Sequence, residues 1–264
     1  MSKWSLWGGV VAAALWPAAA MAQTMPGFEI GPELYYYSYR EPNFVAQTGP
    51  YIGANASYTW VTGGWFFTGN LIADLGYLNY SSNGTGKTTG IWNFTGDLRA
   101  LAGHDFAVLP STVASPFTGI GYRILFDQAG GRSTSTGAVG YDRLSRYLYL
   151  PIGLALGITT GDWVLRPSVE YDFLIQGAQT SYLTEAGFDN DPTNKQRNGY
   201  GLRAAFLAET ATSWGRLSFG PFIRYWNIRS SDTAALNFAG APRFTVFEPA
   251  NNTIEAGATA RLHF

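Results

Sequence analysis

Strand-like segments alternate along this sequence with connections whose lengths also alternate. Ten segments show the period-two pattern of β-strands: 27–40, 48–60, 64–79, 90–102, 114–127, 141–158, 162–175, 198–210, 215–229 and 252–264. The connections 61–63, 159–161 and 211–214 are tight, and 103–113 is somewhat longer. The other five (41–47, 80–89, 128–140, 176–197 and 230–251) are rich in Gly, Ser, Thr, Asn and Asp. This pattern predicts antiparallel strands running up and down, with short turns at one end and long loops at the other. A soluble sandwich gives no reason for such regular alternation.

Within 64–79, 90–102 and 162–175, charge lies on one face only, whereas Arg143 and Arg146 in 141–158 fall on opposite faces. In 90–102, Trp92 and Leu98 point one way, whereas Asp97 and Arg99 point the other. Because a charged side chain facing lipid costs about 2–4 kcal/mol near the midplane, the charged face must be the interior of a barrel in a membrane. We therefore predict an all-β fold, a transmembrane antiparallel up-and-down β-barrel of about ten strands. Eight or twelve strands stay open as alternatives if 103–113 or 230–251 is misassigned.

The last segment adds a resemblance. Residues 252–264 alternate without a break, with Ile254, Leu262 and Phe264 on the apolar face, and the chain stops on that aromatic residue. This ending resembles the terminal strand of bacterial outer-membrane β-barrels, which the barrel-assembly machinery recognises. The resemblance implies that Leu262 and Phe264 form the assembly signal, that the assembly machinery is a partner, and that the barrel lies in outer-membrane lipid and lipopolysaccharide.

The first 22 residues have the features of a secretory signal peptide. Lys3 gives a positive start, 6–15 is an apolar run, and Ala20 and Ala22 form a small-residue cleavage site before Gln23. We therefore expect a signal peptide at 1–22, a barrel domain at 23–264, and location in the bacterial outer membrane.

Composition excludes several classes of function. Lys and Arg together number 17 and Asp and Glu 18, so no charge excess points to nucleic acid. With Cys at 0, disulfides, thiol catalysis and thiolate metal sites are excluded.

Aromatic residues cluster by height along the predicted strands. We expect Trp60, Trp65, Trp163, Trp214 and Phe264 in a periplasmic belt, and Tyr35, Tyr36, Tyr37, Tyr39, Tyr77, Tyr80, Tyr171, Phe173, Tyr225 and Trp226 in an outer belt.

The polar face supplies the candidate site residues. The predicted lumen-lining residues are Glu29, Glu33, Asp74, Asp97, Arg99, Arg123, Arg166, Glu170, Asp172, Arg203, Glu209, Arg224, Glu255 and Arg261. Both signs of charge are well represented. One hypothesis is a network of ion pairs that stiffens the wall of a structural barrel. The other is a narrow, porin-like channel whose charges select small solutes.

Catalysis, cofactors and metals are not expected. Several small outer-membrane barrels are enzymes that use a histidine near the outer rim, but His104 and His263 both lie at the predicted periplasmic end. The stretch 83–88 lacks the first glycine of a phosphate loop, and 189–194 lacks the glycine and glutamate of a calcium loop. A hydrolase at the rim is therefore the less favoured alternative.

The long loops leave a further possibility. The stretches 176–197 and 230–251 are the longest connections, and exposed loops on a rigid scaffold often carry binding. An adhesion or recognition barrel that binds an extracellular ligand is therefore an alternative to the channel. Phe238, Phe244 and Phe247 make 230–251 unusually apolar, and we expect this loop to fold inward as a constriction.

Overall fold

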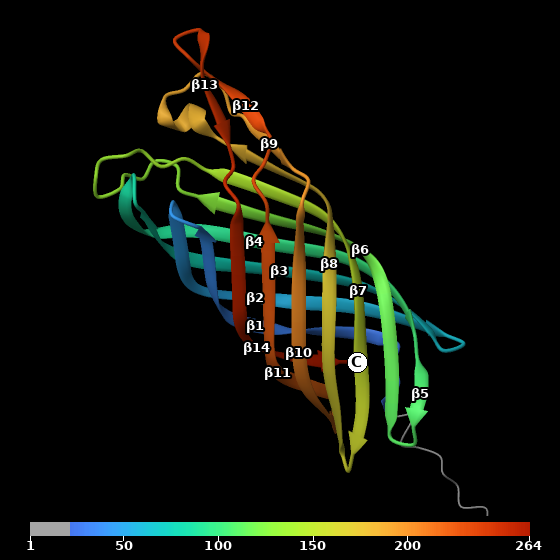
Figure 1. Cartoon of the computed structure of the whole chain (residues 1–264). Helices are drawn as coiled ribbons and strands as arrows, with labels where there is room; N and C mark the ends of the chain where they lie inside the picture. Colours follow the sequence, from blue (N-terminus) through green and yellow to red (C-terminus); the bar gives the residue numbers. More distant parts are fainter. Residues whose placement is uncertain (1–21) are drawn as a thin grey trace, which may run out of the picture.

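Ten long strands close into an antiparallel barrel in the computed structural model, which describes residues 22–264 (Figure 1). The barrel strands are β1 (Gly27–Glu41), β2 (Val45–Thr62), β3 (Trp65–Ser82), β4 (Gly86–His104), β6 (Thr112–Gln128), β7 (Arg143–Thr160), β8 (Trp163–Ser181), β10 (Gly199–Thr212), β11 (Gly215–Ile228) and β14 (Asn251–His263). Each contains or closely overlaps one predicted segment. The predicted fold class is therefore confirmed.

The ring closes through pairings of which two show how distant or interrupted segments meet. The first strand, β1, pairs with β14 on one side, where Tyr36 lies opposite Ala256, and with β2 on the other. In the other pairing, β8 meets β10, with Glu170 opposite Arg203. Because the ring is closed, each of the ten strands is hydrogen-bonded on both sides. A strand in hydrocarbon needs this, since lipid cannot satisfy an unpaired backbone edge.

Smaller elements extend the barrel at both ends. At the end with the short turns, β5 (Phe106–Leu109) forms a hairpin with β6. At the opposite end, β9 (Thr193–Gln196) extends the sheet beside β8, and the 3₁₀ turn Leu183–Ala186 precedes it. A separate hairpin consists of β12 (Thr233–Phe238) and β13 (Ala241–Phe247).

The β12–β13 hairpin corrects one expectation. It projects beyond the outer end of the barrel instead of folding into the lumen (Figure 1). Phe238 and Phe244 at its tip are about half exposed and pack edge-on against Phe188 of the preceding loop. Backbone pairing between the two strands satisfies the polar groups of the hairpin locally, and only the end of the loop after the hairpin, with Glu248, reaches side chains inside the barrel mouth.

Apolar side chains cover the outside of the barrel. Trp65, Leu71 and Trp92 are each about half exposed on this surface, as a lipid-facing band requires. At the periplasmic end Phe264 also faces outward, 5.6 Å from the ring of Phe28. Among residues 22–264, no helix is long and apolar enough to cross a membrane.

The predicted outer aromatic belt is partly wrong. Tyr35, Tyr37, Tyr39 and Trp226 point inward and are almost fully buried, whereas Tyr36 faces outward. Strand alternation explains the error, because the odd-numbered tyrosines share the face of the buried Glu33. The predicted face was therefore wrong for these four residues.

The first described residues, which begin with Ala22 at the end of the predicted signal peptide, lie at the periplasmic mouth. Arg166 donates hydrogen bonds to the carbonyls of Ala22 and Gln23, both at 3.2 Å, and the backbone N–H of Thr24 donates to Asp105 at 2.7 Å. Residues 1–21 of the predicted signal peptide lie outside the described part of the chain.

Candidate functional site

All fourteen predicted lumen residues lie on the inner face of the barrel, and thirteen of them form ion pairs. Asp74 is the exception, and it is held by hydrogen bonds from the Tyr35 hydroxyl at 3.1 Å and the Thr95 hydroxyl at 3.2 Å. The pairs nearest the periplasmic end join Arg261 to Glu29 at 3.0 Å, and Arg166 to Glu209 at 2.7 Å. The sequence did not single out Arg216, which also binds Glu209.

Arg203 of β10 is shared by three carboxylates. Its guanidinium lies 2.6 Å from Asp97, 2.8 Å from Asp172 and 3.3 Å from Glu170. Glu170 is also bound by Arg99, so the cluster joins β4, β8 and β10 across the lumen. Every side chain in it is about nine-tenths buried or more. Strand pairing accounts for part of this cluster, because Glu170 and Arg203 are directly opposed.

A second cluster is built around Arg224 of β11. This guanidinium lies 2.7 Å from Glu33 and 3.2 Å from Glu255, and Glu255 also binds Arg123 of β6. The two clusters pair every one of these buried charges with an opposite one, which buried ions require.

Aromatic rings pack inside the barrel at the level of these clusters. Their arrangement defines an aromatic layer, which consists of Tyr35, Tyr37, Tyr51, Tyr149 and Trp226, each at most 3% exposed. Tyr35 stacks on Tyr51 with ring centroids 5.0 Å apart, and Tyr149 meets Trp226 edge-on at 5.1 Å.

Arginines of the ion-pair clusters lie over these rings. Arg123 is 5.3 Å from the centre of the Trp226 ring, and Arg203 is 5.4 Å from that of Tyr149. A guanidinium at this distance is attracted by the ring quadrupole, and more strongly where water is excluded. Charge pairing and ring packing therefore stabilise the same cross-section of the barrel.

The aromatic layer separates two cavities. The lower cavity, on the periplasmic side, has a volume of about 270 Å³ and is lined in part by Asn55, Asn70 and Arg99. The upper cavity, which we call the vestibule, has a volume of about 690 Å³ and opens at the end with the long loops. No residue lines both cavities, and no residue of the aromatic layer lines either.

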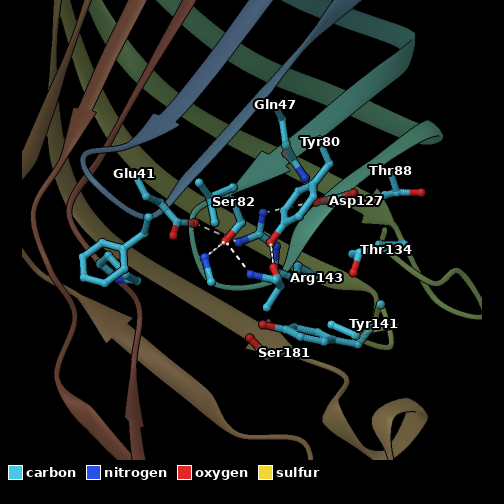
Figure 2. A pocket seen from close by; sticks show the side chains of 18 of the residues that line it. Glu41, Gln47, Tyr80, Ser82, Thr88, Asp127, Thr134, Tyr141, Arg143 and Ser181 are labelled. Carbon is cyan, nitrogen blue, oxygen red and sulfur yellow. Dashed lines mark hydrogen bonds and ion pairs between the residues drawn. The ribbon is translucent and has the colours of Figure 1, made fainter. Parts of the chain in front are cut away.

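Arg143 of β7 organises the floor of the vestibule (Figure 2). Its guanidinium lies 3.0 Å from Glu41, 3.2 Å from Asp127 and 3.7 Å from Glu248. The same Asp127 oxygen, Oδ2, accepts a hydrogen bond from the Gln47 amide at 2.5 Å. Oδ1 of Asp127 is buried and has no hydrogen-bond partner among the described residues.

Glu41 and Glu248 lie on either side of one hydroxyl group. The Tyr39 oxygen is 2.8 Å from Glu41 and 3.1 Å from Glu248. Glu248 also accepts a hydrogen bond from the Gln179 amide. Burial raises the pKa of Glu248 to about 7; the Arg143 guanidinium opposes this shift and the Glu41 carboxylate adds to it. Glu248 therefore changes its charge near neutral pH.

Sequence reasoning did not identify this charged floor. Glu41 continues the inward alternation of Glu29 and Glu33, but the predicted strand ended one residue too early. Asp127 likewise continues the inward face of Arg123. No sequence signal places Glu248 beside them, because it lies after the β12–β13 hairpin and is brought in by the loop.

Both histidines lie far from the vestibule. His104 is the last residue of β4 and lies opposite Trp65, the first residue of β3. His263 contacts the carbonyl of Pro26 at the periplasmic mouth. Within residues 22–264, no group of three or more His, Cys, Asp or Glu side chains could hold a metal ion.

A search with protein-family models finds no match for this chain, and no curated protein matches it in sequence either. The outer-membrane protease OmpT of Escherichia coli has a similar structure, with a TM-score of 0.57 and 9% identity over 92% of this chain and 100% of OmpT.

Two further structures align more loosely. The β domain of the Bordetella autotransporter BrkA gives a TM-score of 0.39 at 12% identity, over 91% of this chain and 100% of that one. The Pseudomonas putida toluene transporter TodX gives a TM-score of 0.33 at 12% identity, over 96% of this chain and 94% of that one.

The closed ring of ten strands, the apolar outer band and the charged interior define a transmembrane β-barrel. Its fold is that of a bacterial outer-membrane β-barrel, the class to which the similar structure of OmpT belongs. At this level of identity the likeness to OmpT is one of fold, so the activity has to be argued from the residues of this chain.

Proposed function

We propose that this protein is a closed, non-conducting outer-membrane barrel that binds a small molecule in its outward-facing vestibule. The aromatic layer carries the proposal, since it fills the lumen between the vestibule and the lower cavity. A barrel of ten strands lies close to the size at which side chains fill the interior. The ion pairs of Arg203 and Arg224 hold the layer from several strands at once, which favours a rigid wall over a gated passage.

The vestibule has the properties of a binding site. Its volume of about 690 Å³ lies within the range of small-molecule sites, which are mostly apolar with a few placed polar groups. Phe44, Tyr141 and Phe247 supply apolar lining, and the charged floor supplies the polar groups. We further propose binding without hydrolysis, because the lining residues include no histidine and Arg143 contacts all three floor carboxylates.

We expect the refolded protein to be electrically silent in a planar lipid bilayer. The reason is that the aromatic layer, which we propose blocks the lumen, lies inside the barrel and below the loops. A variant lacking 233–247 should therefore stay silent too, which distinguishes the aromatic layer from a loop that plugs an open pore. Steady conductance from the folded, full-length protein would contradict the closed-barrel proposal and favour a narrow channel.

The exposed hairpin supports a second candidate function, surface recognition. Phe238, Phe244 and Phe247 are each about half exposed on β12 and β13, beyond the end of the barrel. We expect Phe238→Ser with Phe244→Ser to lower the retention of producing cells on polystyrene several-fold, because apolar adhesion depends on contiguous exposed apolar surface. Thr245→Ala in the same hairpin is the matched control. Unchanged retention, with equal amounts of protein at the surface, would count against this role.

A further inference from the structure

The floor of the vestibule offers an acceptor that no residue in the described part of the chain uses. Asp127 is 5% exposed, and its Oδ2 is occupied by Arg143 at 3.2 Å and Gln47 at 2.5 Å. Its Oδ1, in contrast, has no hydrogen-bond partner among residues 22–264. A buried acceptor without a partner loses the hydrogen bonds that water would give it, and a charged acceptor loses most, so a donor supplied by a ligand would recover this free energy.

The charge of the vestibule selects the kind of donor. Glu41, Asp127 and Glu248 outnumber the two guanidinium groups of the lining, Arg132 and Arg143. Of the two, only Arg143 is ion-paired with the floor carboxylates. Arg132 lies in the outer loops and donates to the Thr89 carbonyl. A positively charged donor would therefore be attracted to the floor, and an anion would be repelled.

The remaining lining sets the rest of the ligand. Phe44, Ile91, Val246 and Phe247 present apolar surface around the floor, and the rings of Tyr80 and Tyr141 lie beside it. A bare inorganic cation would leave this surface in water, whereas an apolar body attached to the cation would cover it. Aromatic rings also attract an organic ammonium group directly.

We propose that the vestibule binds a small organic amine, with its ammonium group on Asp127 and its apolar body against Phe247 and the neighbouring apolar side chains. The inference rests on the proposed function, since it assigns a ligand class to the same vestibule. The acceptor, the net negative charge and the apolar wall are three separate observations that favour this class.

Three probes of nearly equal size test the charge assignment. Phenethylamine is cationic, 2-phenylethanol is neutral and phenylacetate is anionic, and each is titrated into the full-length barrel in lipid nanodiscs by calorimetry. We expect phenethylamine to bind roughly tenfold more tightly than the alcohol, which corresponds to about 1.4 kcal/mol, and phenylacetate to bind most weakly. Equal binding of the three, tighter binding of phenylacetate, or no binding of phenethylamine would overturn the inference.

Substitutions locate the site. Asp127→Asn should weaken phenethylamine binding roughly tenfold, because an amide keeps the shape but loses the charge. Asp162→Asn, the same change in the periplasmic turn before β8, is the matched control and should leave affinity unchanged. The shift in gel mobility on heating verifies that each variant is folded.

If Asp127→Asn does not fold, Phe247→Ala tests the apolar wall and should weaken the binding of phenethylamine and of 2-phenylethanol alike. An unchanged affinity in the folded Asp127→Asn variant would exclude the proposed position of the ammonium group.

The pH dependence gives an independent readout. Glu248 is faced by Tyr39 and Glu41 from β1, Arg143 from β7 and Gln179 from β8, and its pKa is raised to about 7. Between about pH 6 and about pH 8 it loses its proton while an alkylammonium stays charged, so affinity for phenethylamine should rise with pH. Glu248→Gln should remove this rise, and a rise that persists in the variant would contradict the assignment. Conductance tests the closed barrel separately, so failure of the ligand class and failure of the proposed function give different results.

Discussion

Replacing both Trp226 and Tyr149 with alanine is expected to turn a silent barrel into a conducting one. The two rings meet edge-on at 5.1 Å in the aromatic layer, and Trp226 is also 6.3 Å from Tyr147. Their removal would leave a gap between the vestibule and the lower cavity at the level where Arg123 and Arg203 lie. Water can enter such a gap because charged and polar groups surround it. Steady current in a planar bilayer is the measurement.

A matched variant separates loss of the layer from general weakening of the barrel. Trp92 and Tyr122 face outward and are 51% and 43% exposed, so alanine at both removes the same two kinds of ring from the lipid-facing side. This control should stay silent. Each buried aromatic-to-alanine change costs about 3–5 kcal/mol, so folding is verified by gel mobility before currents are compared. A folded Trp226→Ala, Tyr149→Ala barrel that stays silent would show that the aromatic layer is not what closes the lumen.

Arg203→Met is expected to destabilise the barrel by about 3–5 kcal/mol. The substitution keeps an unbranched apolar chain but removes the guanidinium that lies within 3.3 Å of Asp97, Asp172 and Glu170. Those carboxylates then face one another where they are buried, and an unpaired buried charge is costly. Urea titration of the refolded protein in lipid vesicles measures the change in the free energy of unfolding.

Arg166→Met is the control for that measurement. Arg166 pairs with Glu209 near the periplasmic mouth, and its side chain is 23% exposed, compared with 9% for Arg203. Because Glu209 keeps its ion pair with Arg216, no carboxylate is left unpaired, and the expected loss is only about 1 kcal/mol. Equal losses in the two variants would mean that leaving buried carboxylates unpaired is not what destabilises Arg203→Met. A double change, Arg203→Met with Asp97→Asn, should recover part of the loss, because it removes charge from both sides of the pair.

The strands and their two faces could be predicted from the sequence because both depend on local alternation. Trp92 and Asp97 lie an odd number of residues apart on one strand, so one must face lipid and the other the lumen wherever the strand lies in the barrel. All fourteen charged residues expected to face inward do so for this reason. Where the prediction for aromatic residues was wrong, as for Tyr37, position along the strand had been weighed more heavily than the face.

The vestibule and the proposed closure of the lumen depend on the tertiary structure. Glu41, Asp127, Arg143 and Glu248 come from β1, β6, β7 and the segment after β13, and no spacing in the sequence relates them. Alternation likewise places Tyr35 and Trp226 inward but does not say whether their rings meet. That depends on barrel diameter and on the stagger between strands, which are set only when β1 pairs with β14 and the ring closes.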